Sequence, residues 1–207
     1  MTTNLCKLFA ATNNADKLSE IRQILSGSLW QVADLFEFQS YSPPIESGAT
    51  LRQNALIKAR EGFHRTGLMT LADDTGLEID ALNGDPGVHS ARYAGENASY
   101  KMNLHKVLDE LGATPTSSRT ARFRTVMALV GRQVEQCWEG VCEGLITHLP
   151  IGKSGFGYDP IFWSVDLRKT FSQVTQLEKN SVSHRGRALR KLMSFLEDAR
   201  LIDPVRV

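Results

Sequence analysis

Apolar side chains recur every three or four residues in four stretches of the chain, the spacing that places them on one face of a helix. Near the N-terminus, Leu18, Ile21 and Leu25 show this spacing. A short tail over residues 201–207 follows the last of the four stretches. The predicted helices cover residues 16–25, 50–64, 103–111 and 188–199.

Apolar runs without the helical spacing predict strands between these helices. Residues 119–130 are apolar on both faces toward their end, which is typical of a central strand. Residues 68–82 mix strand signals with an acidic turn over residues 71–76. The other predicted strands cover residues 5–11, 31–38 and 134–149, the last with bulges or bends at Gly140 and Gly144.

Loops rich in proline or glycine separate these elements at residues 41–48, 83–87 and 151–160. Such a mixture of strands and helices predicts an α/β or α+β fold, with a long mixed sheet flanked by helices. The chain has 207 residues, of which 42% are hydrophobic. That length supports one domain over residues 1–207, or two intimately joined lobes.

Charge and cysteine content argue against two classes of protein, extended nucleic-acid binders and disulfide-stabilised proteins. The formal net charge of +1 argues against an extended nucleic-acid surface, which needs a basic excess. The cysteines Cys6, Cys137 and Cys142 are odd in number and do not suggest a disulfide framework, which suits a reducing cytosol. No apolar run approaches the roughly 20 residues that span a bilayer, and residues 1–7 do not resemble a signal peptide. We expect a cytoplasmic protein with no membrane partner.

The polar loop Thr12-Asn13-Asn14-Ala15-Asp16-Lys17 connects the first predicted strand to the first predicted helix. Backbone N–H groups at a helix start favour an anion, and Lys17 adds a positive charge one turn later. The loop is not a Walker motif, because the glycines and the Lys-Ser/Thr ending are absent. It predicts a phosphate site, or alternatively an asparagine-rich turn with Asp16 as the helix cap.

The pair Asp73-Asp74 is the candidate metal and proton-accepting centre. If both lie in a strand, their side chains point to opposite faces, so they do not share a proton as a carboxylate dyad does. One of them can then face a site while the other supports it. Mg²⁺ takes one or two protein carboxylates together with phosphate oxygens and water, and Glu46 is a plausible second ligand. The alternative is an acidic turn exposed to water.

Two further segments predict a pocket for an aromatic base. Glycines at 155 and 157 allow close backbone approach around Phe156, which offers a stacking face, and Asp159 can accept hydrogen bonds. Downstream, Lys179, His184 and Arg185 supply donors ahead of the last helix. The alternatives are an ordinary turn with a buried phenylalanine, and a Ser183 helix cap that leaves His184 and Arg185 in solvent.

These motifs, in this order, resemble the inosine triphosphate pyrophosphatase family, whose members remove deaminated purine nucleotides. The likeness covers nearly the whole chain and is most specific at three runs, Ser-Ala-Arg-Tyr-Ala-Gly, Gly-Phe-Gly-Tyr-Asp-Pro and Ser-His-Arg-Gly. The runs occupy residues 90–95, 155–160 and 183–186. The family fold is an elongated, two-lobed α/β structure with a long mixed sheet and a cleft between the lobes.

The resemblance implies a Mg²⁺-dependent homodimer that hydrolyses dITP, ITP or XTP to the monophosphate and pyrophosphate, cleaning the nucleotide pool. Asp74 would be the general base and a metal ligand, with Glu46 as second ligand and Asp73 nearby. Thr75 would contact the substrate. The resemblance also implies substrate binding by Thr12, Asn13, Asn14, Ala15, Asp16 and Lys17 at the triphosphate, and by Phe156, Gly157, Tyr158, Asp159, Lys179, His184 and Arg185 at the base.

Two positions depart from the family pattern. Gln53 replaces an acidic residue that could assist metal or water, and Thr75 replaces a commoner serine while keeping the hydroxyl. Other functions remain open: a pyrophosphatase for another modified nucleoside triphosphate, or a nucleotide-binding module without catalysis. The acidic residues and Lys17 argue against the second, since a protein without catalysis would be free to lose them.

Overall fold

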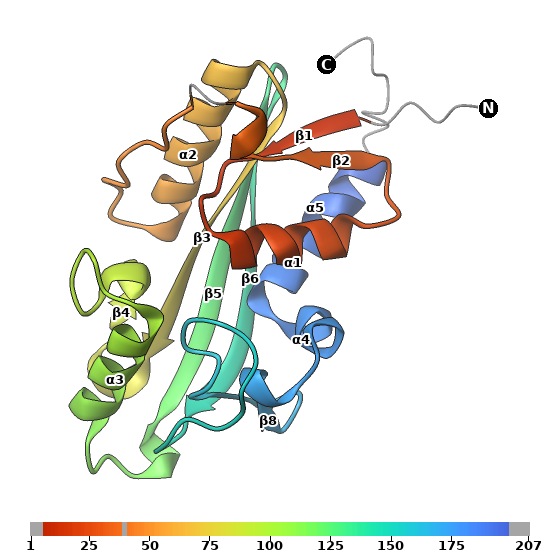
Figure 1. Ribbon diagram of the computed structural model, residues 1–207. Helices are drawn as coiled ribbons and strands as arrows, with labels where there is room; N and C mark the ends of the chain where they lie inside the picture. The colour runs from red at the N-terminus through yellow and green to blue at the C-terminus, as the bar shows by residue number, and fades with distance from the viewer. Residues whose placement is uncertain (1–5, 39–40, 199–207) are drawn as a thin grey trace. The chain divides into compact units, whose positions relative to one another are not determined.

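The computed structural model describes residues 6–38 and 41–198. Within the described residues, the chain forms five α-helices and a mixed sheet of eight strands (Figure 1). Contacts within the chain divide it into two compact units. Unit 1 comprises the described parts of Met1–Asp74, Val126–Glu139 and Ala188–Val207, and unit 2 comprises Thr75–Thr125 and Gly140–Arg187.

The sheet has the strand order β2-β1-β3-β5-β6-β7-β8, with β4 paired to β3. Strand β1 is parallel to β2 and β3, whereas the β3–β4, β6–β7 and β7–β8 pairs are antiparallel. Strand β5 lies between β3 and β6, which confirms the predicted central strand. The strands are β1 Cys6–Ala10, β2 Trp30–Ala33, β3 Thr70–Ile79, β4 Pro86–Gly87, β5 Thr120–Gly131, β6 Val134–Ile146, β7 Phe162–Ser164 and β8 Lys169–Thr170.

Unit 1 is built around β1, β2, the first residues of β3, and the helices α1 Ala15–Leu25 and α2 Leu51–Thr66. Helix α5 His184–Asp198 adds its residues from Ala188 onward. Most of strand β3 and the last three residues of β1 are buried, as expected for parallel strands inside a sheet, whereas β2 buries only Ala33. The core includes Leu8, Ile21, Leu25, Leu71, Met127, Leu129, Leu189, Leu192 and Leu196.

Unit 2 packs helix α3 Tyr100–Leu111 against the other ends of the long strands and also contains helix α4 Gln176–Val182. Ser99 caps α3 by accepting a hydrogen bond from the N–H of Met102. The core of this unit includes Leu77, Ile79, Leu104, Val107, Leu111, Phe123, Cys142, Ile146, Tyr158, Phe162 and Phe171.

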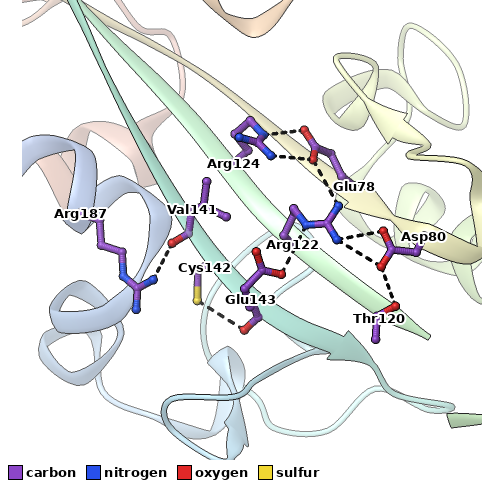
Figure 2. Close-up of polar contacts among 9 residues, drawn as sticks. All are labelled: Glu78, Asp80, Thr120, Arg122, Arg124, Val141, Cys142, Glu143 and Arg187. Atoms are coloured by element: carbon purple, nitrogen blue, oxygen red, sulfur yellow. Dashed lines mark hydrogen bonds and ion pairs between the residues drawn. The ribbon is translucent and has the colours of Figure 1, made fainter. Parts of the chain in front are cut away.

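Charged side chains alternate with these core residues along the strands of unit 2, because successive strand residues point to opposite faces. Figure 2 shows the resulting charge ladder, in which Arg122 and Arg124 of β5 pair with Glu78 of β3. Arg122 also contacts Asp80 and Glu143. These side chains are partly exposed, so the pairs add little stability individually.

Several predicted elements are shifted or wrong. The strand predicted over residues 31–38 ends at Ala33, because Asp34 accepts a hydrogen bond from the N–H of Phe36 and starts a short 3₁₀ turn. Residues 71–76 form no turn: they lie inside β3. Strand β6 continues without interruption through Gly140 and Gly144, where the sequence predicted bulges or bends. Helix α4 was not predicted, and residues 5 and 199–207 lie outside the described part of the chain.

Candidate functional site

The predicted phosphate loop lies between β1 and α1, and its cap is Asn14 rather than Asp16. The Asn14 Oδ1 atom accepts hydrogen bonds from the N–H groups of Asp16 and Lys17, both at 3.0 Å. Thr12 Oγ1 accepts another from the N–H of Asn14 at 3.2 Å. Asn13, Ala15 and Asp16 are exposed. The polar side chains of the loop thus organise the helix start, as the alternative reading expected, with a different capping residue.

The two acidic residues of β3 are buried and contact different lysines. Lys17 Nζ lies 3.1 Å from Asp73 Oδ2, and Lys58 Nζ lies 3.4 Å from Asp74 Oδ1. The residues Asp73 and Asp74 are only 1% and 6% exposed, so the reading as an exposed acidic turn is wrong. Burial raises the pKa of Asp74 above its ordinary value, although the positive charges of Lys58 and Lys17 oppose the rise.

Lys58 joins Asp74 to the proline-rich loop. Its ammonium nitrogen lies 2.7 Å from Glu46 Oε1 as well as 3.4 Å from Asp74 Oδ1. Burial alone would lower the pKa of Lys58, but the carboxylates of Asp74, Asp73 and Glu46 together raise it. One buried cation therefore holds the two carboxylates that the sequence proposed as metal ligands.

Asn54 makes a second link between the same two segments. Its Oδ1 atom accepts a hydrogen bond from the N–H of Gly48 at 2.8 Å, and its Nδ2 donates to Asp74 Oδ2 at 3.2 Å. A Cβ atom on Gly48 would lie 2.6 Å from Asn54 Oδ1, so this close approach requires glycine. We refer to Asn54 and Lys58 as the α2 clamp.

Asn54 and Lys58 are among the residues that resemble the inosine triphosphate pyrophosphatase family, but no role was predicted for them from the sequence. A signal was present, because they lie four residues apart, each immediately before an alanine of the apolar stripe of α2, Ala55 and Ala59. Two polar side chains at that spacing share the helix face next to the stripe. The neighbouring Gln53 points elsewhere, since its Oε1 accepts a hydrogen bond from the N–H of Ala49 at 2.8 Å.

The carboxylates fit a hard cation better than a soft one. In the described part of the chain, no three histidine, cysteine, aspartate or glutamate side chains gather closely enough to hold a metal ion by themselves. Mg²⁺ is commonly held by one or two carboxylates plus phosphate oxygens and water. Glu46 and Asp74 both contact the ammonium of Lys58, and this shows that their oxygens converge on a position where a positive charge is favourable.

In unit 2, Asp159 organises the glycine-rich loop. Its Oδ2 atom accepts hydrogen bonds from the N–H of Phe156 at 2.9 Å and from Lys179 Nζ at 2.6 Å. Asp159 and Lys179 are both buried. Gly155 has φ +80°, and a Cβ there would lie 2.4 Å from Asp159 Oδ2, which explains the need for glycine at this position.

Phe156 is half-buried, and its ring centroid lies 4.4 Å from Lys179 Nζ. The reading as a turn with a buried phenylalanine therefore does not describe it. Tyr158 does enter the core, where its hydroxyl donates to the carbonyl of Ser90 at 2.8 Å. Gly157, between them, is half-buried.

His184 and Arg185 do not lie on a loop ahead of the helix: they form the first turn of α5. Both are buried, so the reading that left them in solvent is wrong. Ser183 does cap this turn, by accepting a hydrogen bond from the N–H of Gly186 at 3.1 Å. The His184 ring stacks on Phe123, with centroids 4.6 Å apart and planes at 22°.

Arg185 connects to Thr75, the residue that follows Asp74 in β3. Its Nη2 donates to Thr75 Oγ1 at 3.1 Å, and Thr75 Oγ1 forms a short hydrogen bond with Thr125 Oγ1. Thr125 is fully buried and was not predicted as part of the site. A threonine inside an apolar strand gives no signal of this kind in the sequence.

The structure brings the predicted residues together in two groups, one in each unit. Unit 1 joins Lys17 to Asp73, and Glu46 to Asp74 through the α2 clamp. Unit 2 joins Phe156 and Lys179 through Asp159, and Thr75 to Arg185. Asp74 and Thr75 are consecutive residues of β3.

Curated relatives match almost the whole chain. A dITP/XTP pyrophosphatase of Halalkalibacterium halodurans is 45% identical over 188 residues, covering 90% of this chain and 97% of the relative. The dITP/XTP pyrophosphatase of Thermoanaerobacter pseudethanolicus is 43% identical over 190 residues, covering 92% of this chain and 96% of the relative.

Solved structures show the same fold. A HAM1 protein of Coxiella burnetii has a TM-score of 0.84 at 41% identity, covering 94% of this chain and all of the other. A nucleoside-triphosphatase, also described as a dITP/XTP pyrophosphatase, from Mycobacterium abscessus has a TM-score of 0.72 at 41% identity, covering 90% of this chain and 98% of the other. The model of the Ham1 family matches residues 8–195, and the chain therefore belongs to the Ham1 family.

Proposed function

We propose that this protein hydrolyses non-standard purine nucleoside triphosphates, dITP, ITP and XTP, to the nucleoside monophosphate and pyrophosphate. The relatives named dITP/XTP pyrophosphatase support this substrate class. The observation that carries the proposal is the burial of Asp74 against Lys58 and Asn54, one residue before Thr75. A buried carboxylate with a raised pKa suits a proton acceptor for an attacking water.

Mg²⁺ is the proposed cofactor, held by Glu46 and Asp74. When bound, it supplies positive charge beside the phosphate oxygens as negative charge develops on them. Lys17 contributes a second positive charge, and Asp73 keeps the Lys17 ammonium in place through the 3.1 Å contact. The backbone and side chains of residues 12–17 are proposed to orient the triphosphate at the start of α1.

Asp74 is proposed to take the proton from the water that attacks the α-phosphorus. The bond from that phosphorus to the bridging oxygen breaks, and pyrophosphate leaves with both electrons of the bond. Thr75 is proposed to contact the substrate with its hydroxyl, which Arg185 and Thr125 orient through the hydrogen bonds described above. The new phosphate oxygen remains on the nucleoside monophosphate.

The unit 2 group is proposed to select the base. Phe156 offers a stacking face, and Asp159 fixes the loop around it. Donors from His184 or Arg185 match a 6-oxo group, which accepts hydrogen bonds. An adenine 6-amino group is itself a donor and would face these donors without forming a hydrogen bond. Lys179 completes the donor set. We further propose that guanine is rejected because its 2-amino group finds no partner or too little room.

The test is pyrophosphate release with Mg²⁺ at mildly alkaline pH from a panel of ITP, dITP, XTP, GTP, ATP and dUTP. Fast release from the first three, with the monophosphate as co-product and little release from GTP or ATP, is the expected result. GTP turnover comparable to that of ITP would refute the 2-amino hypothesis. Release from a different triphosphate would keep the reaction and change the assigned substrate. No release from any triphosphate would favour a nucleotide-binding module without catalysis.

We also propose that the protein is a cytoplasmic homodimer, as the resemblance implies. The three cysteines are free thiols, in keeping with a reducing compartment. Light scattering coupled to size-exclusion chromatography measures the mass directly, and a value near 23.0 kDa, the mass of one chain, would contradict the dimer. In the described residues, no helix is long and apolar enough to span a bilayer.

A further inference from the structure

Both proposed metal ligands already have a counter-ion in this protein. Lys58 Nζ contacts Glu46 Oε1 at 2.7 Å and Asp74 Oδ1 at 3.4 Å. The Lys58 and Asp74 side chains are each 9% exposed, and that of Glu46 is 30% exposed. The buried Lys58–Asp74 pair interacts strongly and the half-buried Glu46 less so, and the ammonium neutralises part of the field of the two carboxylates.

Asn54 holds the same two segments one helical turn earlier. Its Oδ1 accepts a hydrogen bond from the N–H of Gly48, and its Nδ2 donates one to Asp74 Oδ2. Lys58 contacts the other carboxylate oxygen of Asp74. The α2 clamp therefore contacts both oxygens of Asp74. It also contacts Glu46 and the N–H of Gly48 in the proline-rich loop. Protein side chains therefore contact both carboxylates of the proposed metal site.

We propose that Lys58 is the resident counter-ion of Glu46 and Asp74, so that a divalent cation binds weakly until the triphosphate is present. This inference rests on the proposed function for the identity of the metal ligands. A divalent ion entering beside the ammonium is repelled by its like charge. The two carboxylates also attract the ion less strongly, because the ammonium already neutralises part of their negative charge. The phosphates add negative charge and restore the attraction, so metal and nucleotide bind as a coupled pair.

Removing the charge at Lys58 should therefore strengthen metal binding to the nucleotide-free protein. The measurement is a titration with Mn²⁺ alone, read by the electron paramagnetic resonance signal of the free ion. We expect weak binding to the wild type and a dissociation constant at least about tenfold lower for Lys58→Met. Lys58→Arg keeps the charge and should bind Mn²⁺ as weakly as the wild type.

Arg60→Met is the matched control. It removes one positive charge from the same helix, but Arg60 pairs with Glu135 on the surface, where both side chains are exposed. Its Mn²⁺ affinity should equal that of the wild type. An equal gain in Arg60→Met and Lys58→Met would assign the effect to net charge and overturn the proposal.

Equal or weaker Mn²⁺ binding by Lys58→Met would also overturn it. If that variant unfolds in chelator and folds when Mn²⁺ is added, the exchange of one cation for the other is supported directly. The wild type gives an independent reading through thermal unfolding, since millimolar Mn²⁺ without nucleotide should raise its melting temperature little. A large rise would contradict the proposal whatever the variants do.

The two proposals can fail separately. The titration contains no nucleotide, so its outcome does not depend on whether the protein hydrolyses ITP. Conversely, the substrate panel uses wild-type protein with Mg²⁺, and its result does not depend on the affinity of the metal for the nucleotide-free state.

Discussion

Asp74 is the residue on which the proposed hydrolysis depends most directly. Asp74→Asn keeps the size of the side chain and one acceptor oxygen, which can serve either Asn54 Nδ2 or Lys58 Nζ, but it removes the base. We expect kcat for ITP to fall by about a factor of 100 or more, with the fold intact. The measurement is pyrophosphate release, with circular dichroism to confirm folding.

The control for Asp74→Asn is Asp80→Asn, the same change in the charge ladder (Figure 2). Asp80 is an exposed partner of Arg122 and has no role in the proposed chemistry, so its kcat should stay near the wild-type value. Near-normal turnover by Asp74→Asn would refute the assignment of Asp74 as the base.

His184 is the residue on which base selection is proposed to depend. His184→Phe keeps an aromatic ring on Phe123, where the two rings lie 4.6 Å apart, but removes the ring nitrogens. We expect the ratio of kcat/KM for ITP over ATP to fall by about tenfold, because a donor matched to the 6-oxo group is lost. Phosphate binding should change less. An unchanged ratio would show that His184 only packs against the aromatic cluster.

At the scale of elements, helices and strands with long apolar patterns were predicted well. Helices α1, α2 and α3 and the central strand β5 carry full periodic stripes or continuous apolar runs, which depend on local chemistry. Helix α4 has only seven residues, too few for a repeating stripe. Strand β3 was misread because Asp73, Asp74, Thr75 and Gly76 resemble a turn, and only their distant partners explain why they are extended.

In the candidate site too, some residues can be recognised from one segment of the sequence, and others only from their distant partners. Phe156, Asp159 and His184 stand in motifs that can be recognised along the chain. The contacts of Lys58 and Asn54 with Asp74 form only when α2 lies beside the middle of β3, since Asp74 is 16 and 20 residues away from them. Thr125 is 50 residues from Thr75. Such pairings are set by the packing of elements, which periodicity in one segment does not report.

Arg119 secures the end of α3. Its buried guanidinium donates to the carbonyls of Gly112 at 2.7 Å, Thr114 at 2.9 Å and Thr147 at 3.1 Å. Arg119→Met leaves these acceptors with lost bonds, so we expect the free energy of unfolding to fall by about 3 kcal/mol. Urea denaturation measures the change.

The comparison for Arg119→Met is Arg122→Met, a change on the partly exposed charge ladder three residues later. Surface ion pairs contribute little, so the expected loss is below about 1 kcal/mol. Equal losses in the two variants would mean that the three carbonyl contacts of Arg119 carry no special stability.

At the scale of the whole molecule, alkaline pH tests how tightly the core of unit 2 excludes water. Cys142 is fully buried on β6, and burial raises the pKa of its thiol from 9.0 to about 11. The folded protein therefore holds this proton more tightly than the unfolded chain does. Its contribution to stability is complete below pH 9 and is lost as the pH rises through about 11.

Two units of pKa correspond to about 2 to 3 kcal/mol of unfolding free energy over that interval. Burial also raises the pKa of Tyr158, so the wild type alone cannot isolate the thiol. The measurement is therefore the difference between wild type and Cys142→Ala in urea denaturation at several pH values. We expect the stability advantage of the wild type to shrink by roughly that amount between pH 9 and 11. A constant difference would show that water reaches the thiol and that this part of the core opens easily in the native state.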